Sequence, residues 1–224
     1  MNVDHEPALA AFRTALDDFA GVAEGLTDLE LMAASPCTGW TAGDVIVHVH
    51  LGLQEMLLGL VTLTDEKPGT DAATYWRSTP RADEEDQLAA MRFIRLLASS
   101  YRRPSAAVRH LLPTATGVRA AADRLEPGAV RFQGHVLPTG DFLATWAVEL
   151  AVHQLDLARD LPVPPPPPAA LRLARETVEA LAGAAAPADW PDDVVVLLGA
   201  GRVEADARQR AEAPALAGRL PVLG

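Results

Sequence analysis

Three residues that could carry chemistry lie close together in the segment VELAVHQLDLARD, residues 148–160. Glu149, His153 and Asp156 follow one another at intervals of four and three residues. Because each residue of an α-helix turns by about 100°, all three would share one face of a helix. The neighbouring positions are mostly Val, Leu and Ala, so this polar face should point into the protein. An ionised carboxylate buried there needs a partner that compensates for its lost hydration.

A divalent metal ion is one such partner. Glu149 and His153 lie one helical turn apart and can bind the same ion, and helical bundles build metal sites from such pairs on facing helices. A third ligand could come from the segment VIVHVHLGL, which carries His48 and His50. These two histidines would lie about 200° apart around a helix, so only one of them can face the ion. Two histidines and one carboxylate would leave coordination positions open for water or substrate, as in catalytic metal sites.

The same residues have a simpler interpretation. A Glu and a His one turn apart occur by chance in many helices, and a buried neutral histidine hydrogen-bonded to Glu149 would satisfy both groups. The spacing by itself slightly favours this metal-free interpretation. Asp156 could hold the His153 ring in one tautomer or pair with Arg159. The single cysteine, Cys37, is expected to be a small buried side chain rather than a nucleophile.

The elements that would position these residues are mainly helical. Hydrophobic periodicity predicts helices over residues 6–33, 41–63 and 141–161, and a helical region over 82–125. Pro104 and Pro113 are expected to interrupt this last region. Thr41 and Asp44 have the spacing of a capping box, which predicts that the second helix begins there and carries both histidines.

The remaining segments before residue 162 are expected to be irregular or extended. Residues 65–85 are polar and rich in turn-forming residues, which predicts a long surface loop that could cover part of a pocket. Residues 129–138 alternate in polarity and are interpreted as a short extended piece or a hairpin.

The C-terminal quarter of the chain follows a run of prolines. PVPPPPP, residues 162–168, is expected to extend as polyproline II over about 20 Å and to act as a stiff spacer. Beyond it, residues 169–184 are predicted to be helical, and VVVLL, residues 194–198, could be a helix or a strand. The extension 169–224 is too short for an independent core. We therefore expect it to pack on the four-helix body, residues 1–161, or on a second subunit.

Composition narrows the classes of function. The formal net charge of -11 argues against nucleic acid and anionic membranes as partners, because both attract clustered Lys and Arg. The longest apolar run, residues 45–63, is interrupted by polar side chains that make a membrane span costly. One cysteine excludes an internal disulfide and a thiolate zinc cluster, and the N-terminus has no secretory signal pattern. We therefore expect a cytoplasmic protein that acts on a small molecule, with a homodimer as one assembly it could form.

Two motifs are similar to those of a known family. CTGWTAGDVIVHV, residues 37–49, resembles the P-C-x-G-W-T-x-x-D-x-x-x-H signature of the mycothiol-dependent maleylpyruvate isomerase N-terminal family, within the DinB-like four-helix superfamily. DFLATWAVELAVHQLDLARDL, residues 141–161, resembles the helix of that family with the E-x-x-x-H-x-x-D pattern. The resemblance covers residues 6–161. It implies a mainly all-α fold built on a DinB-like four-helix bundle, to which the residues after the prolines add a short, mostly helical C-terminal extension.

The resemblance also implies site residues and a cofactor. It selects His48, Glu149 and His153 as the metal ligands, with Asp156 as a supporting residue behind them. The implied metal is divalent, usually Zn²⁺ with Ni²⁺ or Fe²⁺ as alternatives, and mycothiol or a related thiol is the implied cosubstrate. A thiol bound to such an ion is deprotonated near neutral pH and is a ready nucleophile. The implied function is S-transfer to a small electrophile or its thiol-assisted isomerisation.

Two alternatives stand beside this enzyme hypothesis. One is a non-catalytic metal-binding interaction protein, for which a fourth protein ligand, His50 or Asp156, would be needed to close the metal site. The other is a metal-free helical dimer with a satisfied polar core. The sequence also departs from the family after residue 161, because the full isomerase has a separate α/β domain there. None of that domain's thiol-binding arginines can be placed on Arg202 or Arg219.

Overall fold

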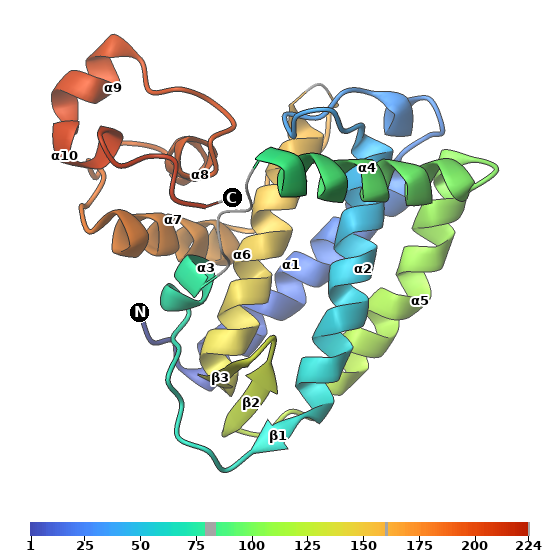
Figure 1. Cartoon of the computed structure of the whole chain (residues 1–224), viewed down its shortest axis with the longest axis horizontal. Helices are drawn as coiled ribbons and strands as arrows, with labels where there is room; N and C mark the ends of the chain where they lie inside the picture. The colour runs from blue at the N-terminus through green and yellow to red at the C-terminus, as the bar shows by residue number, and fades with distance from the viewer. Residues whose placement is uncertain (79–83, 160, 224) are drawn as a thin grey trace.

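Four long helices form the body of the protein. The computed structural model describes residues 1–78, 84–159 and 161–223. The four helices are α1 (His5–Gly25), α2 (Ala42–Val61), α5 (Pro104–Ala122) and α6 (Thr139–Ala158). They lie side by side, with α1 packed on α6 and α2 packed on α5 (Figure 1). This mainly α-helical bundle confirms the fold class predicted from the sequence.

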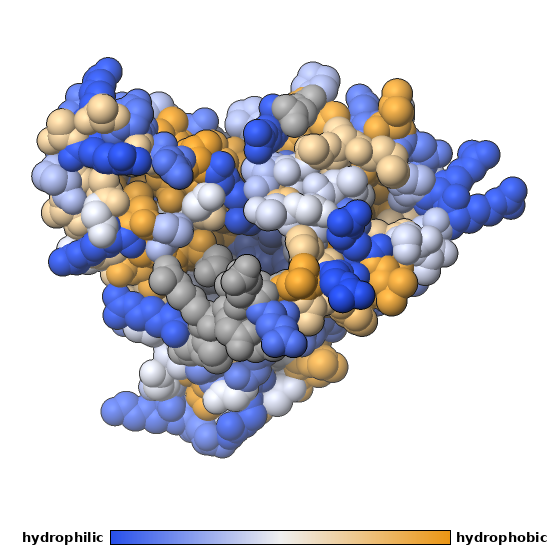
Figure 2. Space-filling model, turned by 45° about the horizontal axis from the view of Figure 1, so that its top comes forward, coloured by the Kyte–Doolittle hydropathy of each residue, from blue (hydrophilic) through white to orange (hydrophobic). Residues whose placement is uncertain are grey.

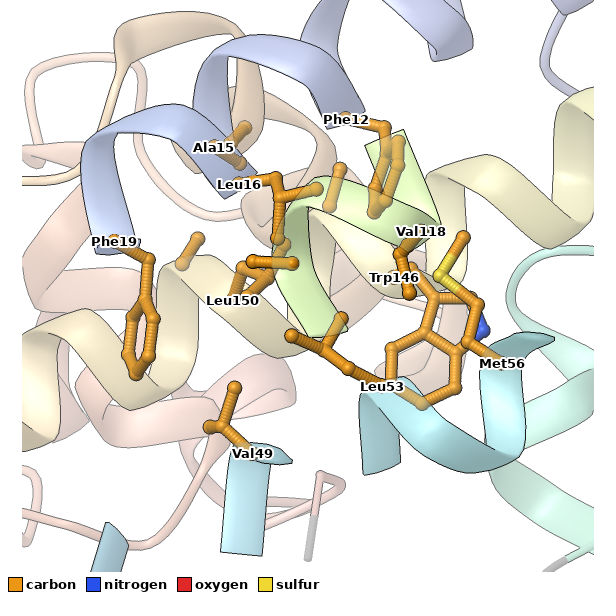
Figure 3. Packing of buried hydrophobic residues seen from close by; sticks show 14 of the residues in the cluster. Phe12, Ala15, Leu16, Phe19, Val49, Leu53, Met56, Val118, Trp146 and Leu150 are labelled. Atoms are coloured by element: carbon orange, nitrogen blue, oxygen red, sulfur yellow. The ribbon is translucent and has the colours of Figure 1, made fainter. Parts of the chain in front are cut away.

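The interior of the bundle is apolar and continuous. Phe12, Leu16 and Phe19 of α1 lie near Leu53 of α2 and Leu150 of α6 (Figure 3), and each is at most 1% exposed. Burying one such side chain contributes about 1.5–3 kcal/mol relative to leaving it in water. Among the described helices, α2 is long and apolar enough to cross a membrane by length and composition alone, yet 56% of that stretch is buried inside the fold, as in a core helix. The packed core fixes the separation of α2 and α6.

The first two helices begin and end where local hydrogen bonds dictate. The predicted helix 6–33 is too long, because α1 ends at Gly25 and a separate 3-10 turn, η1 (Glu30–Met32), follows. The Glu30 carboxylate accepts hydrogen bonds from the backbone N–H and the hydroxyl of Thr27, which starts this new turn. The start of α2 is confirmed: the Thr41 hydroxyl accepts from the Asp44 N–H, and the Asp44 carboxylate accepts from the Thr41 N–H.

The third predicted helical region consists of two helices. α4 (Glu84–Ser100) lies across one end of the bundle and contacts α2 (Figure 1). The predicted interruption at Pro104 is confirmed, and α5 begins at this residue. The predicted break at Pro113 is wrong, since α5 continues through it. Pro113 is exposed, so water can replace the backbone hydrogen bond that the ring removes.

A small antiparallel sheet closes the other end of the bundle. Its strands, in spatial order, are β1 (Leu63–Thr64), β2 (Ala129–Phe132) and β3 (His135–Pro138). β2 and β3 form a hairpin whose turn residues, Gln133 and Gly134, have φ values of 47° and 81°. Of the two structures expected for residues 129–138, a short extended piece or a hairpin, the chain forms the hairpin.

The predicted loop 65–85 contains a short helix, α3 (Thr74–Ser78), that was not predicted from the sequence. The Asp71 carboxylate accepts hydrogen bonds from the backbone N–H groups of Ala73 and Thr74, which caps this helix. The predicted loop 65–85 includes residues 79–83, and the predicted helix start at residue 82 lies among them. These five residues lie outside the described part of the chain.

The C-terminal extension packs on α6. It contains α7 (Pro168–Ala182), α8 (Asp192–Gly199), α9 (Ala207–Glu212) and α10 (Pro214–Ala217), so VVVLL is helical. Val148 and Val152 of α6 share a second apolar cluster with Val178 of α7 and Val196 of α8. The proline run also touches the bundle, since the Pro164 carbonyl accepts a hydrogen bond from Gln154, and its last residue, Pro168, begins α7. α6 is therefore covered by apolar packing on two sides.

Candidate metal centre and its pocket

α2 and α6 bring the three predicted ligands together. Glu149 Oε1 lies 3.3 Å from His48 Nε2 and 3.2 Å from His153 Nε2. One potential ligand atom from each residue lies within 4.8 Å of the other two. Two ligands bound to one tetrahedral Zn²⁺ at 2.0–2.2 Å stand about 3.4 Å apart, so the geometry and the donor types suit such an ion. That an ion binds here stays a prediction.

The helical geometry of α2 separates its two histidines, as expected. The His48 ring lies 4.7 Å from the His153 ring and 5.1 Å from Trp40, measured between centroids. His50 is only 3% exposed, and its Nε2 forms hydrogen bonds with the Thr114 hydroxyl and the Gln54 amide. His50 therefore belongs to the packing between α2 and α5.

The charges of the three residues are strongly coupled. Burial alone would raise the pKa of Glu149, but attraction to His153 and hydrogen bonds from His153 and His48 outweigh it and lower the pKa. Burial alone would lower the pKa of His153, but the Glu149 charge and a hydrogen bond to Asp156 raise it well above its ordinary value. These shifts favour a protonated His153 beside an ionised Glu149 in the metal-free protein. A cation bound between them would replace that proton.

Asp156, the residue expected to support the site, lies behind His153. Its Oδ2 lies 2.9 Å from His153 Nδ1, and its side chain is fully buried. Burial raises the pKa of Asp156, but hydrogen bonds from His153 and Arg202 outweigh it and bring the pKa to about 2. A carboxylate at this position accepts the Nδ1 proton and leaves Nε2 of His153 directed at the other two ligands.

One residue of this network, Arg202 of the C-terminal extension, was not predicted from the sequence. Its Nε donates to Asp156 Oδ1 at 2.8 Å, and its Nη2 donates to Asp156 Oδ2 at 3.2 Å. No spacing rule connects the two residues, because they are 46 positions apart and lie on different elements. An unpaired buried carboxylate was the one signal that pointed to a cationic partner.

A second cluster with possible ligand atoms shares His153 with the first. Cys37, His153 and Asp156 also lie within 4.8 Å of one another, and the Cys37 thiol donates to Asp156 Oδ2 at 3.1 Å. Cys37 is buried, as expected, at 7% exposed. The Arg202 guanidinium already neutralises Asp156, so a cation gains less there than beside Glu149. The triad His48, Glu149 and His153 is the better metal site.

A pocket of about 620 Å³ opens beside the triad. His48, Glu149 and His153 line it together with Trp76 of α3, Met91 of α4 and Arg202 of the extension. Figure 2 shows this face of the molecule hollowed between the C-terminal helices and the bundle. The site therefore has ligands on two bundle helices and walls from segments far apart in the sequence.

The family follows from a comparison with known proteins. Residues 12–158 match the family model described as the mycothiol maleylpyruvate isomerase N-terminal domain. The chain belongs to this family. The matched residues include most of α1, all of α2, α5 and α6, and the three candidate ligands of this mycothiol maleylpyruvate isomerase N-terminal domain.

Two solved structures share the fold of this family member. The crystal structure of a mycothiol-dependent maleylpyruvate isomerase has 16% sequence identity and a TM-score of 0.60, with 90% of each chain covered. A histidine-to-alanine mutant of a mycothiol-dependent maleylpyruvate isomerase has 16% identity and a TM-score of 0.59, again with 90% of each chain covered. No curated protein matches the sequence. Because 90% of this chain is covered and the extension 169–224 is longer than the remaining tenth, part of the extension is also matched by the solved structure. The departure expected after residue 161 is therefore smaller than the sequence suggested.

Proposed function

We propose that the protein is a divalent-metal-dependent enzyme that uses mycothiol or a related low-molecular-weight thiol to modify a small electrophile. One observation carries this proposal: ligand atoms of His48, Glu149 and His153 converge at the edge of a pocket of about 620 Å³. When bound there, a metal such as Zn²⁺ would lower the pKa of a thiol and supply a thiolate nucleophile at neutral pH. Membership of the family, and the shared fold with a mycothiol-dependent isomerase, support a thiol-dependent isomerase.

The protein's own residues would have separate tasks. The side chains of His48 and Glu149 are 34% and 25% exposed, whereas that of His153 is 7% exposed, so the ligand set is open on one side. Asp156 would orient His153, and Arg202 would keep Asp156 charged. The pocket walls would hold the electrophile near the open side and keep bulk water away from it.

Two outcomes of the chemistry are compatible with this arrangement. In isomerisation, the thiol sulfur bonds to one carbon of an activated double bond, whose remaining single bond can rotate. Loss of the same sulfur then restores the double bond and returns the thiol. In S-transfer, the carbon–sulfur bond is kept and a proton is added to the adjacent carbon. We place this activity in the cytoplasm, where a reduced thiol pool and a free Cys37 are expected.

The non-catalytic alternative fits less well. It requires a fourth protein ligand that closes the metal site, and His50 and Asp156 were the candidates. His50 is hydrogen-bonded to Thr114 and Gln54, and Asp156 is hydrogen-bonded to Arg202, so both candidates already have partners within the protein. Among the described residues neither candidate would close the site, so a bound ion would keep a position for a ligand from the pocket, as a catalytic site requires.

The decisive test is metal content followed by thiol-dependent turnover. We expect about one equivalent of Zn²⁺ per purified chain, and we expect His48→Ala, Glu149→Ala and His153→Ala each to lose it. His110→Ala, a histidine outside the site, is the matched control and should keep the metal. The loaded protein should then convert maleylpyruvate or conjugate an electrophile only when mycothiol is added. Full metal retention in all three ligand variants would reject the site.

A further inference from the structure

The pocket beside the candidate metal centre is lined by a few titratable groups and by a larger apolar surface. The titratable groups belong to the triad or to the hydrogen-bond network around Asp156. Most of the rest is apolar or aromatic and comes from five parts of the chain: Trp40, Trp76, Leu88, Met91, Val152 and Leu223. A ligand that enters would exchange water for these surfaces, and each Å² of apolar area removed from water favours binding.

The cation in the described lining is already engaged. Arg202 donates from Nε and Nη2 to Asp156, and from Nη1 to the carbonyl of Ala200 at 3.1 Å. Each of its three guanidinium nitrogens therefore makes a hydrogen bond within the protein. Its positive charge is already balanced by Asp156, so a carboxylate on the substrate would gain less from Arg202 than from an unpaired cation.

The charges around the pocket also disfavour binding of a second carboxylate. One carboxylate, that of Glu149, already lines the pocket, and the whole chain carries a formal net charge of -11. One divalent ion with Glu149 and one thiolate would be neutral, as the pair of Asp156 and Arg202 already is. A dianion would thus find no uncompensated positive charge among the described residues that line the pocket.

One wall of the pocket depends on an unusually close approach. Gly39 has a φ of +77°, and a Cβ placed on it would lie 2.5 Å from the Met91 sulfur. The positive φ favours glycine in the loop before α2, and the missing Cβ leaves room for the Met91 thioether of α4. The flexible thioether of Met91 and the rings of Trp40 and Trp76 form an adaptable surface that suits an aromatic ligand.

Both tryptophans of the lining also carry a polar group without a partner among the described residues. The indole N–H groups of Trp40 and Trp76 are buried and have no hydrogen-bond partner among the described residues. A buried donor without a partner costs free energy, which a ligand oxygen would recover if the indole ring turned toward it. An uncharged carbonyl oxygen would supply such an acceptor without bringing a charge into the pocket.

From these observations we infer that the site takes an uncharged electrophile with an aromatic or aliphatic body, such as an aryl-substituted α,β-unsaturated ketone, in preference to a dicarboxylate such as maleylpyruvate. This inference rests on the proposed function, because it concerns the second substrate of the same site. In the conjugation step the thiol sulfur would bond to the β-carbon, and the α-carbon would receive the proton that the thiol lost.

A matched pair of ligands tests the substrate class apart from catalysis. Benzylacetone and its para-carboxylate cannot undergo conjugate addition and differ only by one charged group. We expect the Zn²⁺-loaded protein to bind the neutral ketone at least about tenfold more tightly, measured by ligand-observed NMR titration. Equal or tighter binding of the carboxylate, or no binding of the neutral ketone, would overturn the inference.

A pair of variants on α4 locates the wall. Met91→Lys should weaken binding of benzylacetone and strengthen binding of its carboxylate. Phe93→Lys, on the same helix at a position that is 55% exposed, should leave both affinities unchanged. Unchanged affinities in Met91→Lys would show that the assigned wall is wrong.

Turnover separates this inference from the proposed function. The reactive pair, benzylideneacetone and its para-carboxylate, should follow the same order in kcat/KM when mycothiol is present. Selective binding of the neutral ketone with no thiol-dependent turnover of either compound would uphold the substrate class and count against the proposed function.

Discussion

Arg202 and Asp156 form a two-pronged ion pair, with Nε–Oδ1 at 2.8 Å and Nη2–Oδ2 at 3.2 Å. Asp156 is on the helix that carries two candidate ligands, and Arg202 is on the C-terminal extension. Because Asp156 also accepts from His153 Nδ1, the extension is linked to the candidate metal centre through one carboxylate. The extension thus does more than cover apolar surface.

This link predicts that Arg202 supports metal binding without touching the metal. Arg202→Met should weaken Zn²⁺ affinity by about 10–100-fold, because Asp156 loses the partner that fixes its position behind His153. Competition with a chromophoric chelator measures the affinity. Arg208→Met, which removes an exposed arginine paired with Glu212, should bind Zn²⁺ like the wild type. Equal affinities for the two variants would contradict the role of Arg202.

Asp141 predicts a specific dependence of stability on pH. Burial raises the pKa of this carboxyl to about 6, and its Oδ2 has no hydrogen-bond partner among the described residues. A group whose pKa is higher in the folded state stabilises the protein below its unfolded pKa, near 4, and this contribution is lost as the pH rises through 6. Asp141→Asn removes the titration, while its amide oxygen can still accept from the Val3 N–H.

The difference in unfolding free energy between Asp141→Asn and the wild type should therefore shift in favour of the variant between pH 4 and pH 7, by up to about 3 kcal/mol. Urea unfolding followed by circular dichroism at several pH values measures this shift. Parallel curves for the two proteins would show that Asp141 is not titrating in this range.

The contact between α7 and α8 predicts a steric effect. A Cβ on Gly199 would lie 2.3 Å from Val178 Cγ2, so Gly199→Ala should destabilise the protein by about 1–3 kcal/mol. Val178→Ala in the same chain should recover part of that loss, because it removes the clashing methyl group. Gly21→Ala in α1, where a Cβ meets nothing within 4 Å, should be neutral or slightly stabilising in the same unfolding assay.

The capping box at the start of α2 predicts a smaller effect. Thr41→Ala removes the side-chain acceptor for the Asp44 N–H and should cost about 1 kcal/mol of unfolding free energy. Thr116→Ala in the middle of α5, whose hydroxyl only bonds to the Leu112 carbonyl, is the matched control and should change stability by less than about 0.5 kcal/mol. A loss as large in Thr116→Ala would leave no special role for the cap.

Local patterns in the sequence determined most of the helices. The Thr41–Asp44 spacing located the start of α2, and the apolar periodicity located α1 and α6. The errors arose where short-range interactions compete. Asp71 starts a helix inside a polar segment, and Pro113 is tolerated because it faces water. Such outcomes depend on hydrogen bonds and solvent exposure that periodicity does not encode.

The sequence also determined which side chains of α6 share a face, because helical geometry fixes the relation of Glu149, His153 and Asp156. Spacing could not show that His48 rather than His50 meets them; the family resemblance supplied that choice, and packing of α2 against α6 places His48 there. Only the tertiary structure brought Arg202 to Asp156 and joined Trp76, Met91 and Leu223 in one pocket. These contacts join segments far apart in the chain, and their positions follow from how whole elements pack.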